Sequence, residues 1–198
     1  MAVKQLGKKG MFLTFIAISL IAALIVIFTP SDINLSGDVQ AIKTRVSNVN
    51  EYVSDLESVY LENALKATGR RTIIALIKYM EAKTMFLTSF DDAFSEVLLD
   101  GTIGGILIDD IIDPDIMTDN TYNDLINEIK TTAEQTFNVD TVYDISDIRV
   151  YQTRPWFIEV EADIIFSVTS ETASWTRDVI IKTEISVENF DDPYYLVN

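Results

Sequence analysis

The sequence predicts an α+β protein in which an N-terminal transmembrane helix precedes a long extracellular helix, several short helices and an antiparallel sheet of three or more strands. Three patterns lead to this fold class. Residues 11–29 are apolar without interruption, apolar side chains then recur at three- and four-residue intervals from Val39 to Tyr60, and they alternate with polar ones from Ile158 to Val168. These patterns are typical of a membrane helix, an amphipathic helix and a half-buried strand, respectively.

A membrane helix is predicted for residues 11–29, MFLTFIAISLIAALIVIFT, which contain no charged side chain. At about 1.5 Å per residue, a helix over this range is about 28 Å long, close to the thickness of a bilayer's hydrocarbon core. The alternative is a cleaved secretory signal, which also combines a basic start with an apolar stretch. The run is longer than the roughly 7–15 residues of a signal core, and no small-x-small cleavage site follows at 28–31, so a retained anchor is favoured.

The charges that flank the run orient it in the membrane. Lys4, Lys8 and Lys9 precede the run, whereas the first acid of the chain is Asp32. Short basic flanks stay on the cytoplasmic side. We therefore expect a single-pass protein of the cell membrane, with a cytoplasmic N-terminus and an extracellular C-terminal domain.

The charge balance limits both the partners and the chemistry of this chain. It has 31 acidic residues against 15 basic ones, which argues against nucleic acid as a partner because phosphate binding needs clustered Lys and Arg. It contains no His and no Cys, which excludes disulfides, zinc fingers, thiol nucleophiles and His-based triads. We expect no enzyme activity and no cofactor.

The junction between the basic flank and the apolar run has a further interpretation. Lys8-Lys9-Gly10, followed directly by Met11-Phe12-Leu13, resembles the class III signal peptide of archaeal type IV pilin-like proteins. The resemblance implies cleavage between Gly10 and Met11, which would remove residues 1–10 as a cytoplasmic leader and leave the apolar helix at the start of the mature protein. Many bacterial pilins carry Glu at the fifth mature position, where this chain has Phe15, so the archaeal proteins are the nearer match. A basic flank that ends in Gly by chance is the alternative.

Residues 30–38 are expected to form a short neck before an extracellular domain at 39–198. Within the neck, Asn34-Leu35-Ser36 fits the N-glycosylation pattern, which makes Asn34 a candidate glycosylation site. From Val39 the apolar spacing is that of a heptad seam. This seam predicts either a coiled-coil stalk that pairs chains or a helix whose narrow stripe packs on its own domain. Its members are Val39, Ile42, Val46, Val49, Val53, Leu56 and Tyr60.

After the seam, residues 72–87 are apolar on most faces and are expected to form the helical spine of the core. Gly69 is either tolerated within one long helix or lets a second helix begin. Ser89 can cap a short helix at 90–100, which Gly101 then ends.

A last helix is predicted to open at Asn120 or Thr121 and to end near Asn138. Asp124 stands three residues after Thr121, which is a capping-box arrangement. The inner face of this helix is expected to consist of Leu125, Ile129, Ala133 and Phe137.

The segment 101–119 between these helices is rich in acids and could suggest a calcium site, because Ca²⁺ binds carboxylate oxygens. The acids are Asp109, Asp110, Asp113, Asp115 and Asp119. Their spacing does not match the EF-hand pattern, and Ile111-Ile112 interrupts them. We interpret the segment as a solvated acidic loop and predict no metal site.

Three strands are predicted near the end of the chain, at 147–153, 155–169 and 173–187, with Pro155-Trp156 opening the second strand. Residues 170–172 supply the second turn. Consecutive strands joined by short turns form an antiparallel meander, whose apolar face must be covered by the helices.

Two classes of function are compatible with these features. The first is a membrane-anchored structural subunit, pilin-like, that contributes to a cell-surface filament or envelope structure; its partners would be the lipid bilayer and copies of itself or other pilin-like subunits. The second is an anchored extracellular sensor or ligand-binding module that uses the sheet or the acidic loop.

Overall fold

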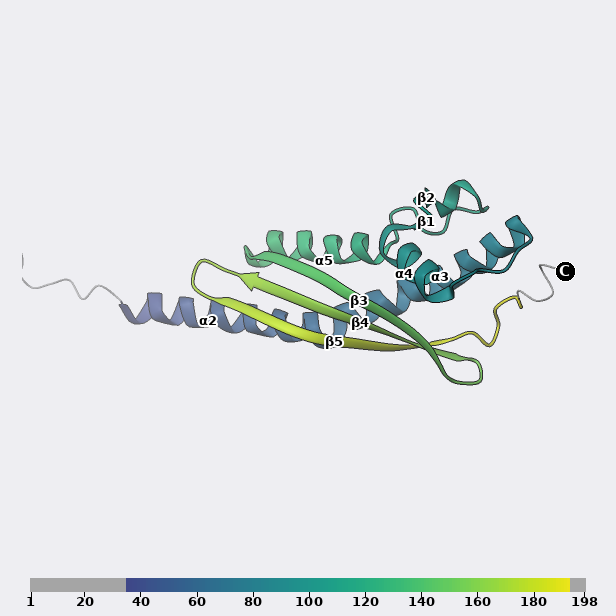
Figure 1. Cartoon of the computed structure of the whole chain (residues 1–198). Coiled ribbons are helices and arrows are strands. Elements are labelled where there is room, and N and C mark those ends of the chain that lie inside the picture. The colour runs from purple at the N-terminus through teal and green to yellow at the C-terminus, as the bar shows by residue number, and fades with distance from the viewer. Residues whose placement is uncertain (1–34, 193–198) are drawn as a thin grey trace, which may run out of the picture. The chain divides into compact units, whose positions relative to one another are not determined.

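The computed structural model describes residues 35–192 and confirms an α+β fold with a long helix and a three-stranded antiparallel sheet (Figure 1). The predicted leader and transmembrane helix lie outside the described residues. Within residues 35–192, no helix is both long and apolar enough to cross a membrane. Thr44–Asn198 forms one compact unit, and the residues up to Lys43 belong to another.

The long helix has three consecutive parts: α2 (Leu35–Asp55), a π-helical turn η1 (Leu56–Tyr60) and α3 (Leu61–Lys83). The residues at both junctions, Asp55 and Tyr60, keep helical backbone angles, so the helix does not break. The helix also begins inside the range that we predicted as a neck, because its first turn starts at Leu35.

Gly69 lies inside α3 and does not separate two helices. A Cβ atom at this position would lie 2.7 Å from Cδ1 of Ile185, closer than side-chain atoms normally approach. The missing side chain therefore lets α3 lie directly against strand β5. This close approach explains why a residue with low helix propensity stands in the middle of a long helix.

The heptad seam is covered only in its middle, because its last member, Tyr60, is 43% exposed. Val49, Val53 and Leu56 are buried in the core of the Thr44–Asn198 unit, whereas Val39 and Ile42 are 60% and 48% exposed. The interpretation as a stripe that packs on its own domain is therefore confirmed for the buried part.

The two shorter helices begin and end at the predicted caps. In α4 (Phe90–Asp100), the Ser89 hydroxyl accepts a hydrogen bond from the Asp92 backbone N–H at 3.4 Å, and Gly101 ends the helix with a left-handed φ of 67°. The next helix, α5 (Tyr122–Phe137), carries the predicted capping box of Thr121 and Asp124 and ends at Asn138.

The predicted inner face of α5 is partly wrong. Its fully buried side chains are Tyr122, Ile126 and Ala133, while Phe137 remains 38% exposed. The buried face is therefore rotated relative to the one we inferred from spacing. One reason is Tyr122, which lies at the first position of the helix and donates a hydrogen bond from its buried hydroxyl to the Leu61 carbonyl at 3.2 Å.

The sheet is the predicted meander, in the order β3 (Asp140–Arg154), β4 (Phe157–Thr169) and β5 (Ser174–Ser186). Two predicted boundaries were wrong. Strand β3 starts at Asp140 rather than Asp147. A bulge between Ile145 and Asp147 shifts its alternation by one residue, and this shift hid the first part of the strand from the sequence pattern. Pro155 and Trp156 belong to the β3–β4 turn and not to a strand, and Trp156 has a left-handed φ of 67°.

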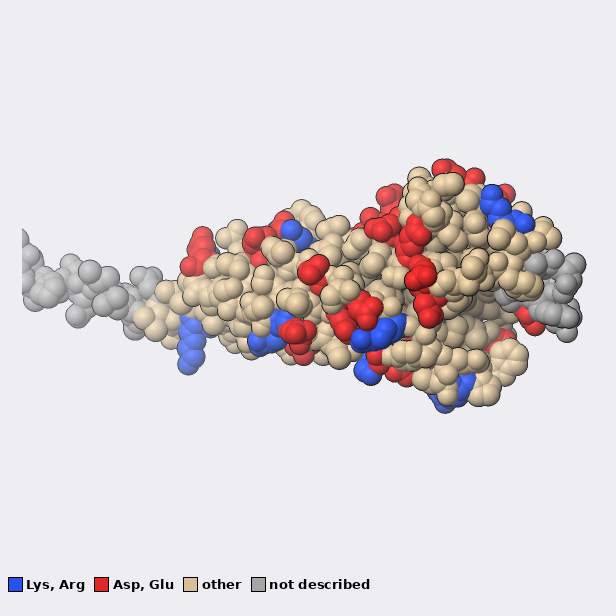
Figure 2. Space-filling model, in the orientation of Figure 1, with Lys and Arg blue, Asp and Glu red and all other residues tan. Residues whose placement is uncertain are grey.

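The core lies between the helices and one face of this sheet. Helix α3 contacts β5 and β4, and α5 contacts β3. On the covered face, alternate residues of β4 are no more than 1% exposed, as the alternation predicted: Val160, Ala162, Ile164, Phe166 and Val168. The opposite face carries charged side chains, and Figure 2 shows acidic and basic groups side by side over the middle of the sheet.

Candidate interaction surface

The residues that the sequence singled out for processing and modification lie outside the described part of the chain. These are the candidate cleavage bond between Gly10 and Met11 and the candidate glycosylation site at Asn34. Both assignments stay predictions.

The acidic loop is organised around Asp109, whose carboxylate is half-buried. It accepts hydrogen bonds from the backbone N–H groups of Ile116, Met117 and Thr118 at 2.9, 2.8 and 2.6 Å, and from the Thr118 hydroxyl at 2.9 Å. Asp109 is therefore a structural residue of the loop rather than a solvated one. Within residues 35–192, no three acidic side chains are grouped so that they could hold a metal ion.

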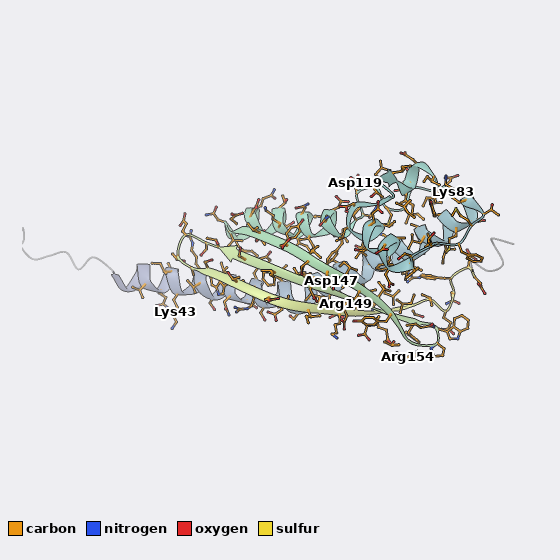
Figure 3. The ribbon with its side chains drawn as sticks, viewed as in Figure 1. Lys43, Lys83, Asp119, Asp147, Arg149 and Arg154 are labelled. Carbon is orange, nitrogen blue, oxygen red and sulfur yellow. The ribbon has the colours of Figure 1, made fainter. Side chains whose placement is uncertain are left out.

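The exposed face of the sheet carries a cross-strand charge network centred on Glu161 of β4. Register places Arg149 of β3 on one side of this carboxylate and Lys182 of β5 on the other. The Arg149 Nε atom donates to Glu161 at 3.3 Å, and Lys182 donates to its second oxygen. Arg149 also pairs with Asp163 at 2.5 Å and with Asp147 at 3.1 Å (Figure 3).

This network stabilises the charged form of Glu161. The side chain is only 10% exposed, and the hydrogen bond from Lys182 is the largest cause that lowers the pKa of Glu161 to about 2. Both carboxylate oxygens already accept from a cation. We therefore infer that the network links the three strands structurally. Glu161 has no free carboxylate oxygen that could serve as a general acid or base.

The feature best suited to binding is an apolar groove of about 430 Å³ at the end of the sheet where β3 turns into β4. Its floor is formed by the C-terminal half of α3, including Ile73, Ile77 and Met80. Phe90 at the start of α4 and Phe190 after β5 also line it. Among the described residues that line it, nine of twelve are apolar.

Trp156 is the most exposed aromatic residue of this groove. Its side chain is 60% exposed, and its backbone adopts the left-handed conformation that Gly or Asn adopts at lower cost. The Trp156 carbonyl accepts a hydrogen bond from the Val187 N–H at 2.9 Å, which fixes the turn against the segment after β5. A large indole held at an exposed turn in this conformation contributes little to the core and is well placed for contact with another molecule.

The rim of the groove is acidic. The three polar lining residues are Glu188, Asp191 and Asp192. The nearby Lys78 is paired with Glu81 at 2.9 Å and also interacts electrostatically with Asp191. The Arg70 guanidinium lies over the Phe190 ring, 5.6 Å from its centroid. An occupant of the groove should therefore be apolar with basic flanks.

Sequence reasoning missed this groove because its walls come from segments that are far apart in the chain. One local signal was available, since Pro155-Trp156 separates two alternating segments and could have been read as a hairpin turn. Such a turn would have placed an aromatic side chain at an exposed tip.

Comparisons with protein-family models, curated proteins and solved structures found no match. Function is therefore inferred from the residues and contacts of the chain itself.

Proposed function

We propose that this chain is a membrane-anchored, pilin-like extracellular subunit that contributes structural contacts to a cell-surface filament or envelope assembly. The N-terminal apolar run would anchor it in the bilayer, and the α+β unit would lie outside the cell. The proposal assigns it no catalytic role.

The observation that carries the proposal is the continuous helix from Leu35 to Lys83. It follows the apolar run in sequence, and its C-terminal part, α3, packs along the antiparallel meander. A long N-terminal helix followed by a sheet-bearing head is the order that the resemblance at Gly10 and Met11 implies. The exposed seam residues Val39 and Ile42 further support a role in contacts between chains, since apolar residues repeated on one helix face favour burial against a partner.

An anchored ligand-binding module is the second candidate, and the apolar groove is the observation that favours it. Its volume of about 430 Å³ falls within the roughly 300–1,000 Å³ of small-molecule sites. Such sites usually enclose most of the ligand, whereas Trp156 at the edge of this groove is 60% exposed. The open shape favours contact with a protein surface instead.

A substitution in the leader tests the structural proposal in the native host. Gly10→Leu should block processing, so that the full-length precursor accumulates in the membrane and surface filaments containing the chain are lost from electron micrographs. Gly7→Leu is the matched control, because it changes a glycine of the same leader away from the expected bond, and it should leave processing intact. Normal filaments in the Gly10→Leu strain would contradict the proposal.

The expected topology is tested separately. A protease added to intact cells should digest residues 30–198, because the basic flank keeps only the N-terminus inside. Protection of this part until the cells are lysed would show that the orientation is wrong.

A further inference from the structure

Among the apolar surfaces that residues 35–192 expose, two can be matched to each other. The first is the exposed N-terminal part of the heptad seam, which we call the α2 stripe: Val39 and Ile42, 60% and 48% exposed, followed by half-buried Val46. The second is the groove between α3 and Trp156.

The α2 stripe has the spacing of a helix that binds in a groove. Val39, Ile42 and Val46 stand at positions i, i+3 and i+7, so they lie along one side of α2. Amphipathic helices that lie in apolar grooves use anchors at these positions. The groove offers the matching surface, because nine of its twelve described lining residues are apolar.

The charges beside the two surfaces are complementary. Lys43 and Arg45 flank the α2 stripe, and residues 39–46 contain no acid. Lys43 is exposed and extends from α2 (Figure 3). Arg45 makes a 3.5 Å ion pair with Glu171, but both side chains are about 70% exposed, so this pair is weak and can be exchanged. The groove presents the acids Glu188 and Asp191.

We propose that the α2 stripe of one copy binds in the apolar groove of another copy. This inference rests on the proposed function, for which it supplies the subunit contact. The two surfaces are different, so the interface is heterologous and each bound copy still offers a free stripe or a free groove. Contacts of this type form rings or open filaments rather than closed dimers.

Symmetric contacts are disfavoured by the same charges. Two grooves facing each other would bring their acidic residues together. Two stripes facing each other would bring Lys43 and Arg45 of one chain toward those of the other. Both arrangements are repulsive. Pairing a stripe with a groove avoids both repulsions.

The absence of cysteine in the natural chain allows a direct test by disulfide cross-linking. The full chain carrying both Ile42→Cys and Trp156→Cys is expressed in the native membrane and treated with a mild oxidant. Because each copy then has one thiol at each end of the interface, the proposal predicts a ladder of dimers, trimers and higher species on a non-reducing gel. Ile42→Cys with Glu188→Cys, an exposed groove position, provides a second pair if Trp156→Cys prevents folding.

The matched control combines Ile42→Cys with Val142→Cys, which is 57% exposed on the sheet face away from the core. This pair should give no ladder. A second arm reverses charge: Lys43→Glu with Arg45→Glu should reduce the ladder by about two- to tenfold, since each exposed ion pair is worth up to about fivefold in affinity. Adding Glu188→Lys should partly restore it.

Four results would overturn the inference. They are the absence of a ladder from both cysteine pairs, a disulfide within one chain, a dimer of a variant that carries only Trp156→Cys, and a ladder that is equally strong in the Val142→Cys control. Its failure is distinguishable from failure of the proposed function. If no ladder forms but filaments still depend on Gly10, only the proposed contact is refuted. If the chain is never processed, the proposed pilin-like function is refuted.

Discussion

The close approach of α3 to β5 predicts that Gly69 and Ile185 are energetically coupled. In Gly69→Ala, the new methyl group would lie 2.7 Å from Ile185 Cδ1, while its contacts of 3.7 Å with Phe94 Cζ and 3.9 Å with Val160 Cγ2 are ordinary. The clash is therefore with a single methyl group. Ile185→Val removes that methyl group and makes the space available.

The expected changes in the free energy of unfolding follow from two opposing effects, helix propensity and overpacking of the core. Replacing Gly by Ala inside a helix stabilises it by about 1 kcal/mol, whereas overpacking a core costs about 1–3 kcal/mol. Gly69→Ala alone should thus destabilise the protein by about 0–2 kcal/mol. In the Ile185→Val background, which itself costs about 0.5–1.5 kcal/mol, the same change should stabilise it by up to about 1 kcal/mol.

The assay is a double-mutant cycle based on urea unfolding, followed by circular dichroism. A fragment that begins at Pro30 is suitable, because every fully buried apolar residue of the described core lies at or after Val49. The expected coupling free energy is about 1–3 kcal/mol. If Gly69→Ala changes the free energy of unfolding equally in both backgrounds, Gly69 is not there to accommodate Ile185 and this reasoning is wrong.

Three further predictions concern charged groups. The pKa of Glu161 is lowered to about 2 in the fold, against an ordinary value of 4.5. The contribution of its charged form to folding stability is therefore complete above about pH 4.5 and is lost as the pH falls toward 2. The difference in melting temperature between the wild type and Glu161→Gln should shrink over that range, and a constant difference would contradict this prediction. Asp109→Ala should cost about 1–3 kcal/mol in urea unfolding, because it leaves backbone donors without their acceptor, whereas exposed Asp115→Ala should be close to neutral. Calcium should leave the melting temperature unchanged beyond general screening, and a saturable rise at micromolar calcium would reveal a site in the acidic loop.

The parts of the fold that the sequence predicted are those determined by local chemistry. Ser89, Gly101, the Thr121–Asp124 box and Asn138 mark helix ends because each satisfies backbone groups of its own neighbours. The alternation in β4 predicted its buried face correctly, because that strand is paired on both sides and its described register has no bulge against β5.

The features that were missed depend on contacts between distant segments. The bulge after Ile145 moves the alternation of β3 by one residue, so the first half of that strand did not show a continuous period of two. Gly69 could not be assigned from its own segment, because the reason for it is Ile185. The groove likewise exists only when α3, the Trp156 turn and the segment after β5 come together.

The central claim is that a pilin-like precursor is processed at its N-terminus and keeps its apolar helix. Mass spectrometry of the intact chain, isolated from native membranes, measures this directly. We expect a mature protein that begins at Met11, with Lys4, Lys8 and Lys9 removed and residues 11–29 retained. A protein that begins at Met1 or Ala2 would be a simple anchored domain, and one that begins near residue 30 would be a secreted domain. Either result would contradict the pilin-like assignment.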